Sequence, residues 1–264
     1  MTKVESASSA GLDGEPHLVF QPAVDLATGR LLGFEALLRW DHPTDGAIPP
    51  LVLIPMAEDR GRMTELNTWV LSEACAQAAR WPLNLQISVN CSVFQLRRAE
   101  ATIAAVAALE ESGLNADRLT IEVTEASVAD DDAVEDLHAM ARVGVQLAVD
   151  DVTFADHSML ASLRDGRINT IKIDGSLIAG ITHPGRRSRA IVETIVTLSR
   201  SLGICTVAEA VETAEQAALL RDLGADVGQG YYFSPPLPFE EAYALAAEER
   251  PPSFAVPSLR RTKL

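Results

Sequence analysis

Short apolar segments alternate with longer amphipathic segments along most of the chain. The apolar segments are rich in β-branched residues and recur about once per 30 residues, the length of a strand–helix–strand unit. The clearest of them are 85–89, 119–123, 145–149, 168–173 and 204–207. Helical spacing of apolar residues falls between them, for example at Ile191, Ile195, Leu198 and Leu202. This alternation predicts a parallel sheet with crossover helices.

One of the predicted helices has recognisable ends. Thr213 and Gln216 have the spacing of a capping box, in which each side chain binds the backbone N–H of the other residue. Gly224 follows Leu223, where a left-handed residue commonly ends a helix. The pattern predicts a helix over 214–223.

The apolar segments end in polar residues, mostly carboxylates and amides. These residues are Glu35, Asn90, Glu122, Asp150, Asp151, Lys172, Glu209 and Gln229. In a parallel (β/α)8 barrel the carboxyl ends of the strands meet at one rim, and the reacting groups lie there. Carboxylate and amide oxygens suit Mg²⁺ or Mn²⁺ better than zinc. The sequence therefore predicts an α/β barrel with a metal site at its rim.

Glu122 and Lys172 are stronger evidence for a functional site than the other polar residues at the strand ends. A lone acid after a strand, such as Asp151, is more often a helix N-cap or a loop residue. Glu122 and Lys172 instead lie between apolar residues inside strands. Because side chains alternate across a strand, Glu122 shares a face with Thr120, and Lys172 shares one with Thr170. A buried charge is costly without a partner, so each is expected to face an opposite charge or a proton.

Length and charge narrow the class of protein. The 264 residues fit one barrel domain, expected at 17–249 between a disordered leader (1–16) and a C-terminal tail (250–264). A formal charge of −15 argues against DNA binding. The sequence has no apolar run of membrane length and no signal peptide, so we expect a cytoplasmic protein that does not bind membranes. Three widely spaced cysteines favour neither disulfides nor zinc.

Short motifs follow one another over about 18–238: Phe20-Gln21-Pro22, Glu35-Ala36-Leu37-Leu38-Arg39, Ser88-Val89-Asn90, Ile121-Glu122-Val123-Thr124-Glu125, Asp150-Asp151, Ile171-Lys172-Ile173-Asp174, Val207-Ala208-Glu209 and Gly228-Gln229-Gly230-Tyr231. These motifs resemble those of the EAL-domain cyclic di-GMP phosphodiesterases. Their identity and order make the resemblance specific. It implies a TIM-like (β/α)8 barrel whose first strand is antiparallel.

The resemblance also implies a reaction and a role for each motif residue. Two divalent ions, Mg²⁺ or Mn²⁺, would support hydrolysis of one phosphodiester of cyclic di-GMP to linear pGpG, and Ca²⁺ would inhibit it. Six residues would hold the ions directly or through water: Glu35, Asn90, Glu122, Asp150, Asp151 and Glu209. Lys172 would orient or deprotonate the attacking water, with Asp151 and Glu209 as the other catalytic groups. The substrate contacts would be Gln21, Leu37, Arg39 and Gln229. Glu125 would anchor the loop after Asp151.

The chain departs from the family at two places. After Asp151 the family has a loop with two glycines, and residues 152–159 contain neither. Ala210 stands where the family usually has glycine. Since the family's loop supports the second metal and a dimer contact, reduced activity and a weakened homodimer are expected consequences. An inactive cyclic di-GMP receptor or protein-interaction module is the alternative, and a regulatory protein partner is expected in either case.

The polar residues at the strand ends, considered without the resemblance, are also compatible with a third class of protein. Acids at successive strand ends and a lysine base also occur in enolase-type barrels. Such barrels generally need a separate capping domain. The 264 residues leave little sequence outside the barrel to form one, which disfavours this reading.

Overall fold

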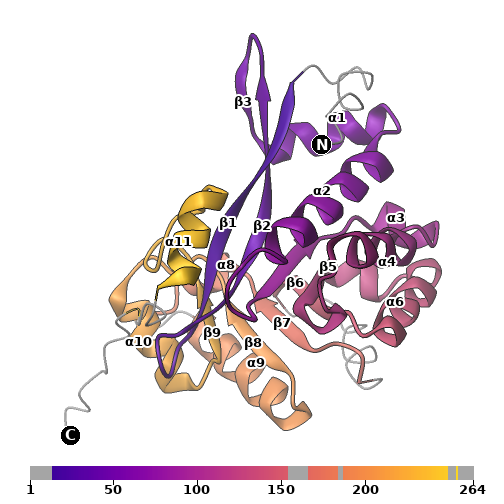
Figure 1. Cartoon of the computed structure of the whole chain (residues 1–264). Coiled ribbons are helices and arrows are strands. Elements are labelled where there is room, and N and C mark those ends of the chain that lie inside the picture. Colours follow the sequence, from indigo (N-terminus) through magenta and orange to yellow (C-terminus); the bar gives the residue numbers. More distant parts are fainter. Residues whose placement is uncertain (1–13, 154–165, 184–186, 249–253, 255–264) are drawn as a thin grey trace, which may run out of the picture.

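A closed barrel of eight strands forms the centre of the protein (Figure 1). The computed structural model describes residues 14–153, 166–183, 187–248 and 254. In order around the barrel, the strands are β1 (Glu15–Asp25), β2 (Leu31–His42), β4 (Gln86–Asn90), β5 (Leu119–Thr124), β6 (Gln146–Val152), β7 (Thr170–Ile173), β8 (Cys205–Ala208) and β9 (Val227–Gln229). β1 is antiparallel to both β2 and β9, whereas the remaining neighbours are parallel. The expected TIM-like barrel with an antiparallel first strand is confirmed.

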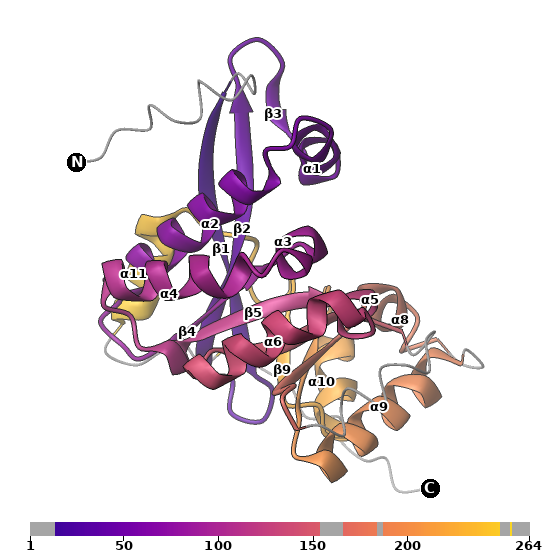
Figure 2. The same cartoon turned by 90° about the vertical axis from the view of Figure 1, so that its right-hand side faces the viewer.

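Helices cover the outside of the barrel (Figures 1 and 2). They are α1 (Pro50–Asp59), α2 (Met63–Ala78), α3 (Val93–Arg97), α4 (Ala101–Ser112), α5 (Glu125–Val128), α6 (Asp131–Val143), α8 (Gly175–Ala179), α9 (Ser188–Leu202), α10 (Ala214–Leu223) and α11 (Phe239–Ala247), with a 3-10 turn at Ala116–Arg118. α2, α4 and α6 lie side by side, as Figure 2 shows. Within the part of the chain that the structure describes, each helix is too short or too polar to cross a lipid bilayer.

The first two strands extend well beyond the barrel (Figure 1). A short strand, β3 (Gly46–Ile48), pairs with the end of β2, and α1 packs against β2. This extension has a small hydrophobic core of its own, formed by Trp40, Leu53, Ala57, Met63 and Leu66. The end of β2 is therefore held away from the barrel rim.

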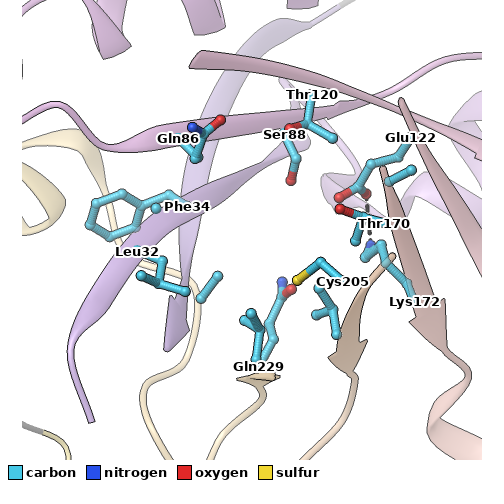
Figure 3. Close-up of a pocket in the computed structure, with 15 residues that line it drawn as sticks. Leu32, Phe34, Gln86, Ser88, Thr120, Glu122, Thr170, Lys172, Cys205 and Gln229 are labelled. Atoms are coloured by element: carbon cyan, nitrogen blue, oxygen red, sulfur yellow. Dashed lines mark hydrogen bonds and ion pairs between the residues drawn. The ribbon is translucent and has the colours of Figure 1, made fainter. Parts of the chain in front are cut away.

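Side chains alternate across the barrel strands as the sequence predicts. The β-branched residues of β4, β5 and β7 point outward and are buried against the helices: Ile87, Val89, Ile121, Val123, Ile171 and Ile173. Several residues below the rim are small, including Ser88, Thr120, Ala148 and Thr170, and together with larger residues such as Phe34 they line a chamber of about 160 Å³ (Figure 3). Three hydroxyl groups line this chamber, so it has the polarity and room to hold water.

The helix predictions are confirmed at α10 and α9, but the buried face of α9 is not the apolar row that indicated the helix. α10 spans Ala214–Leu223 with both bonds of the capping box, and Gly224 ends it at a φ of 86°. In α9 the buried residues are Val192, Ile195, Val196 and Ser199, whereas Leu202 is 44% exposed. The face is rotated because a row of smaller residues, with the same i, i+3, i+4, i+7 spacing, packs against the barrel.

The ends of the domain are only partly described. β1 begins at Glu15, so two residues of the range expected as a leader belong to the first strand. Residues 1–13 and nearly all of the expected tail lie outside the described residues. Cys75, Cys91 and Cys205 are free thiols, the first two of them buried.

The cap of α10 provides a test of the fold. Replacing Thr213 with alanine removes the acceptor for the Gln216 backbone N–H, whose bond to Oγ1 is 3.2 Å long. We expect the free energy of unfolding to fall by about 1 kcal/mol in urea denaturation. Thr197→Ala, at an exposed site within α9, is the matched control and should change it by less than about 0.5 kcal/mol. Equal effects of the two substitutions would contradict the capping role.

Candidate metal centre at the barrel rim

Lys172 lies at the centre of the polar layer that closes the barrel. Its side chain is 2% exposed, and its ammonium contacts carboxylates from four different strands or strand ends. The distances from Nζ are 2.7 Å to Glu122, 2.7 Å to Glu209, 3.1 Å to Asp150 and 3.4 Å to Glu35. Figure 3 shows the Lys172–Glu122 pair beside Thr170, at one side of the chamber that Ser88 and Thr120 also line. The barrel thus brings together acids separated by as many as 174 positions in sequence.

Two amides fix the carboxylate of Glu35. Asn90 Nδ2 donates to Oε1 at 2.8 Å, and Gln229 Nε2 donates to Oε2 at 2.7 Å. Gln229 also lies 3.3 Å from Gln21 Oε1, since Gln21 and Glu35 are paired across β1 and β2. Both amide nitrogens face the acid, so the amide oxygen of Asn90 is available to a cation.

A bulge in β6 turns two consecutive acids toward the site. In a regular strand, Asp150 and Asp151 would point to opposite faces. The pairing of β6 with β7 shifts register between Val149 and Val152, and Asp151 adopts a φ of 55°. Bulges re-aim side chains in this way beside active sites, and aspartate is one of the residues that tolerates a positive φ. As a result, one oxygen each of Asp150, Asp151 and Glu209 lie within 4.8 Å of one another.

Crowding of negative charge controls the protonation of the buried acids. Burial, followed by the charge of Glu35, raises the pKa of Glu122 well above its usual value. Burial also acts to raise the pKa of Glu35, but the Lys172 charge and the bonds from Gln229 and Asn90 outweigh it and lower that pKa. For Lys172, burial alone would lower the pKa. The surrounding carboxylates, led by Glu122 and Glu35, raise it well above normal instead.

The two acids nearest the solvent are also perturbed upward. Burial, and then repulsion from Asp150, raises the pKa of Glu209 to about 7, although Lys172 opposes the shift. Burial and the charges of Asp150 and Asp174 raise the pKa of Asp151. Each shift reports a carboxylate that lacks enough nearby positive charge.

The donor set fits divalent cations. Glu35, Glu122, Asp150, Asp151 and Glu209 supply five carboxylates against one ammonium, a formal charge of −4 that two divalent ions would balance. All the donors are hard oxygens, as Mg²⁺ and Mn²⁺ prefer. The six residues expected to hold metal therefore converge in a cluster that needs added positive charge.

Most of the expected substrate residues line one cavity beside this cluster. The cavity has a volume of about 560 Å³, and Gln21, Leu37 and Gln229 line it together with Glu35 and Glu209. The wall also contains Asp174, Glu212 and Tyr231, to which the sequence analysis gave no role. Each of them lies two or three residues after a polar strand end, so this spacing is the signal that could have identified them.

Two expected site residues stand apart from the cavity. Arg39 follows Glu35 by four residues along β2, about 13 Å for an extended strand, and its Nη1 donates to the backbone oxygen of Leu38 at 2.8 Å. It is not among the residues that line the cavity. Glu125 begins α5 directly after β5. Most of the loop that it was expected to anchor, from 154 to 165, lies outside the described residues, as does most of the non-consensus segment 152–159.

Comparisons with known proteins agree with this geometry. The family model "EAL domain" matches residues 5–236. The cyclic di-GMP phosphodiesterase NbdA of Pseudomonas aeruginosa is 36% identical over 240 residues, which make up 89% of this chain and 30% of NbdA. The oxygen sensor protein DosP of Escherichia coli is 38% identical over 232 residues, 85% of this chain and 28% of DosP. The chain thus spans less than a third of either relative.

Two solved structures share the fold. The c-di-GMP complex of the PaMucR phosphodiesterase superposes with a TM-score of 0.81 and 34% identity, covering 86% of this chain and 94% of that one. The calcium/cy-diGMP complex of Klebsiella pneumoniae BlrP1 superposes with a TM-score of 0.73 and 33% identity, covering 84% of this chain and 56% of that one.

The raised pKa of Glu209 predicts a pH-dependent stability in the metal-free protein. Between its ordinary value of 4.5 and its folded value of about 7, the folded protein keeps a proton that the unfolded chain has released. The contribution of this group to the free energy of unfolding therefore falls as the pH rises from 4.5 to 7. We expect urea denaturation in a chelating buffer to show that the free energy of unfolding falls less steeply between pH 4.5 and pH 7 in Glu209→Gln than in the wild type. Parallel slopes for the two proteins would contradict the assignment.

Proposed function

Because the chain belongs to the EAL domain family, we propose that it hydrolyses one phosphodiester bond of cyclic di-GMP, giving linear pGpG, with the help of two Mg²⁺ or Mn²⁺ ions. The observation that carries this proposal is the convergence of five carboxylates and the Asn90 amide around Lys172. A cluster with a formal charge of −4 would repel a cyclic dinucleotide with two phosphodiester charges. Bound cations are therefore a requirement of this function as well as a catalytic aid.

The metal-binding residues in this proposal are Glu35, Asn90, Glu122, Asp150, Asp151 and Glu209. When bound at such a site, a pair of divalent ions supplies positive charge for the attacking and leaving oxygens and acidifies water. Glu35 is already oriented for this task, because Asn90 and Gln229 hold its two oxygens. Among the five acids, Asp151 and Glu209 are the most exposed, and a nucleophilic water would enter beside them.

Lys172 has two roles in the proposed reaction. Its ammonium keeps the acids close together, and it donates a hydrogen bond that orients the attacking water. The water oxygen forms a new bond to phosphorus as the bond from phosphorus to the ribose oxygen breaks. One hydrogen of that water ends on the released ribose hydroxyl, so the products are a phosphate monoester and an alcohol.

The substrate would lie in the adjoining cavity. Gln21 and Gln229 present amides to the dinucleotide, and Leu37 provides an apolar contact for a base. Arg39 would bind a phosphate after releasing the backbone oxygen of Leu38 and swinging toward the site. Asp174, Glu212 and Tyr231 extend the cavity wall.

The cellular setting is part of the same proposal. We place the activity in the cytoplasm, in a homodimer that the non-consensus loop weakens and under the control of a regulatory protein. The similarity to the EAL domain family supports the homodimer. Analytical ultracentrifugation with and without cyclic di-GMP tests it, and a strictly monomeric protein in both conditions would exclude it.

Replacing Glu35 with alanine should abolish turnover. The change removes a carboxylate that contacts Lys172, Asn90 and Gln229, so we expect the rate of pGpG release with Mg²⁺ or Mn²⁺ to fall by at least about 100-fold. Glu110→Ala, on the exposed face of α4, is the matched control and should keep the wild-type rate. Chromatography of the nucleotide products gives both rates.

The metal requirement separates an enzyme from a receptor. Turnover should stop in a chelating buffer and return with Mg²⁺ or Mn²⁺, and Ca²⁺ should support binding of cyclic di-GMP without cleavage. A wild-type protein that binds the dinucleotide but releases no pGpG under any of these metals would contradict the proposed hydrolysis. That result would assign the chain to the receptor class.

A further inference from the structure

Two residues that follow neighbouring strands, Gly175 after β7 and Ala210 after β8, have backbone conformations that another residue would prefer. Ala210, directly after Glu209, has a φ of 49°, a region where alanine is strained and glycine is not. Gly175 begins α8 with a backbone outside that region, where alanine would favour the helix more than glycine does. The local backbone would favour glycine at position 210 and alanine at position 175, the reverse of what the chain has. Such conflicts concentrate at functional sites.

A single steric contact accounts for both residues. A Cβ atom built on Gly175 would lie 2.7 Å from the Cβ of Ala210. Carbon atoms pack best at about 3.5–4.0 Å, so a side chain at 175 would require a shift of roughly 1 Å. The backbone conformation at position 175 does not require glycine. Glycine is required there because the methyl group of Ala210 fills the space that a side chain at position 175 would need.

The loop that carries Ala210 has little room to move. Glu209 N donates to Ile173 O at 3.2 Å, and Val211 N donates to Gln229 O at 3.0 Å. On its other side, a Cβ on Gly230 would lie only 2.3 Å from backbone atoms of Val211, which shows how closely the two loops approach. A push on Ala210 is therefore transmitted to Glu209.

The segment that carries Gly175 is held as well. Gln216 Nε2 donates to Ile178 O at 3.2 Å and so ties α8 to the start of α10. Gly175 follows Lys172 by only three residues, with Asp174 between them as the N-cap of α8. If α8 moved instead of Ala210, the strand end that carries Lys172 would be displaced. Either movement alters the 2.7 Å contact between Lys172 and Glu209.

We propose that Gly175 is a positioning residue, which accommodates the methyl group of Ala210 and thereby keeps Glu209 in register with Lys172, Asp150 and Asp151. The inference rests on the proposed function for its catalytic consequence. Its structural consequence is independent of turnover. In this chain, the loss of the usual glycine at 210 is offset by the absence of a side chain at 175.

A double-mutant cycle tests the pair. Gly175→Ala, Ala210→Gly and the combined variant are compared with the wild type for kcat, KM, the Mn²⁺ dissociation constant from electron paramagnetic resonance, and Tm. A displacement of about 1 Å at a catalytic group can reduce kcat by about 100-fold. We expect Gly175→Ala to lower kcat by about 10- to 100-fold, with a smaller change in KM, and to weaken Mn²⁺ binding. Adding Ala210→Gly should restore kcat and Mn²⁺ affinity to within a fewfold of the wild type.

Stability separates a positioning role from a merely structural one. The combined variant has alanine at the helical position 175 and glycine at position 210, where φ is positive. The Tm of this variant should therefore equal or exceed that of the wild type, without any gain in kcat. Wild-type kcat and Mn²⁺ affinity in Gly175→Ala would overturn the proposal. So would a folded combined variant that stays as defective as Gly175→Ala.

The outcome stays interpretable if one measurement is lost. If Gly175→Ala does not fold, the combined variant must fold and bind Mn²⁺ for the proposal to stand. If the wild type shows no turnover, the proposed hydrolysis fails. The cycle is then decided by Mn²⁺ affinity and Tm, and additive effects of the two substitutions on both quantities would refute the coupling.

Discussion

The ammonium of Lys172 is the interaction on which the rest of the site depends. It is almost completely buried and lies within 3.4 Å of carboxylates from residues 35, 122, 150 and 209. A buried lysine is unfavourable without partners, and so are four crowded acids, so each side of this cluster stabilises the charged form of the other. Closure of the barrel by the antiparallel β1 completes the arrangement, because it sets Gln21 opposite Glu35 and Gln229 beside both.

The single charge of Lys172 does not neutralise the five carboxylates of the cluster, and this excess of negative charge is what a metal-dependent function would use. The raised pKa values of Glu122, Asp151 and Glu209 are three local signs of the same deficit of positive charge. Divalent cations would remove the deficit and bring an anionic dinucleotide to a rim that otherwise repels it. Asp151 and Ala210, two of the three non-glycine residues with a positive φ among the described residues, lie at the same rim. Strain of this kind persists where the surrounding structure over-determines a functional geometry.

Much of the fold and of the site follows from strand periodicity. Alternation placed Thr120 on one face with Glu122 and Thr170 on one face with Lys172, and all four side chains line the chamber inside the barrel. Periodicity could not reveal the bulge at Asp150–Asp151, because an extra residue leaves no mark in an apolar run. The resemblance assigned Arg39 to the substrate without showing that β2 continues to His42, beyond the rim. The cavity residues Asp174, Glu212 and Tyr231 were missed because they lie in loops, where no repeat fixes direction.

Anomalous diffraction from crystals soaked with Mn²⁺ tests the central claim most directly. Two peaks should appear among Glu35, Asn90, Glu122, Asp150, Asp151 and Glu209, at oxygen distances of about 2.2 Å, close to those of other first-row divalent ions. The Lys172 ammonium should move away from at least one carboxylate as the ions take over its charge. Crystals that show no peak at this rim, with Lys172 still in contact with all four acids, would contradict a two-metal centre.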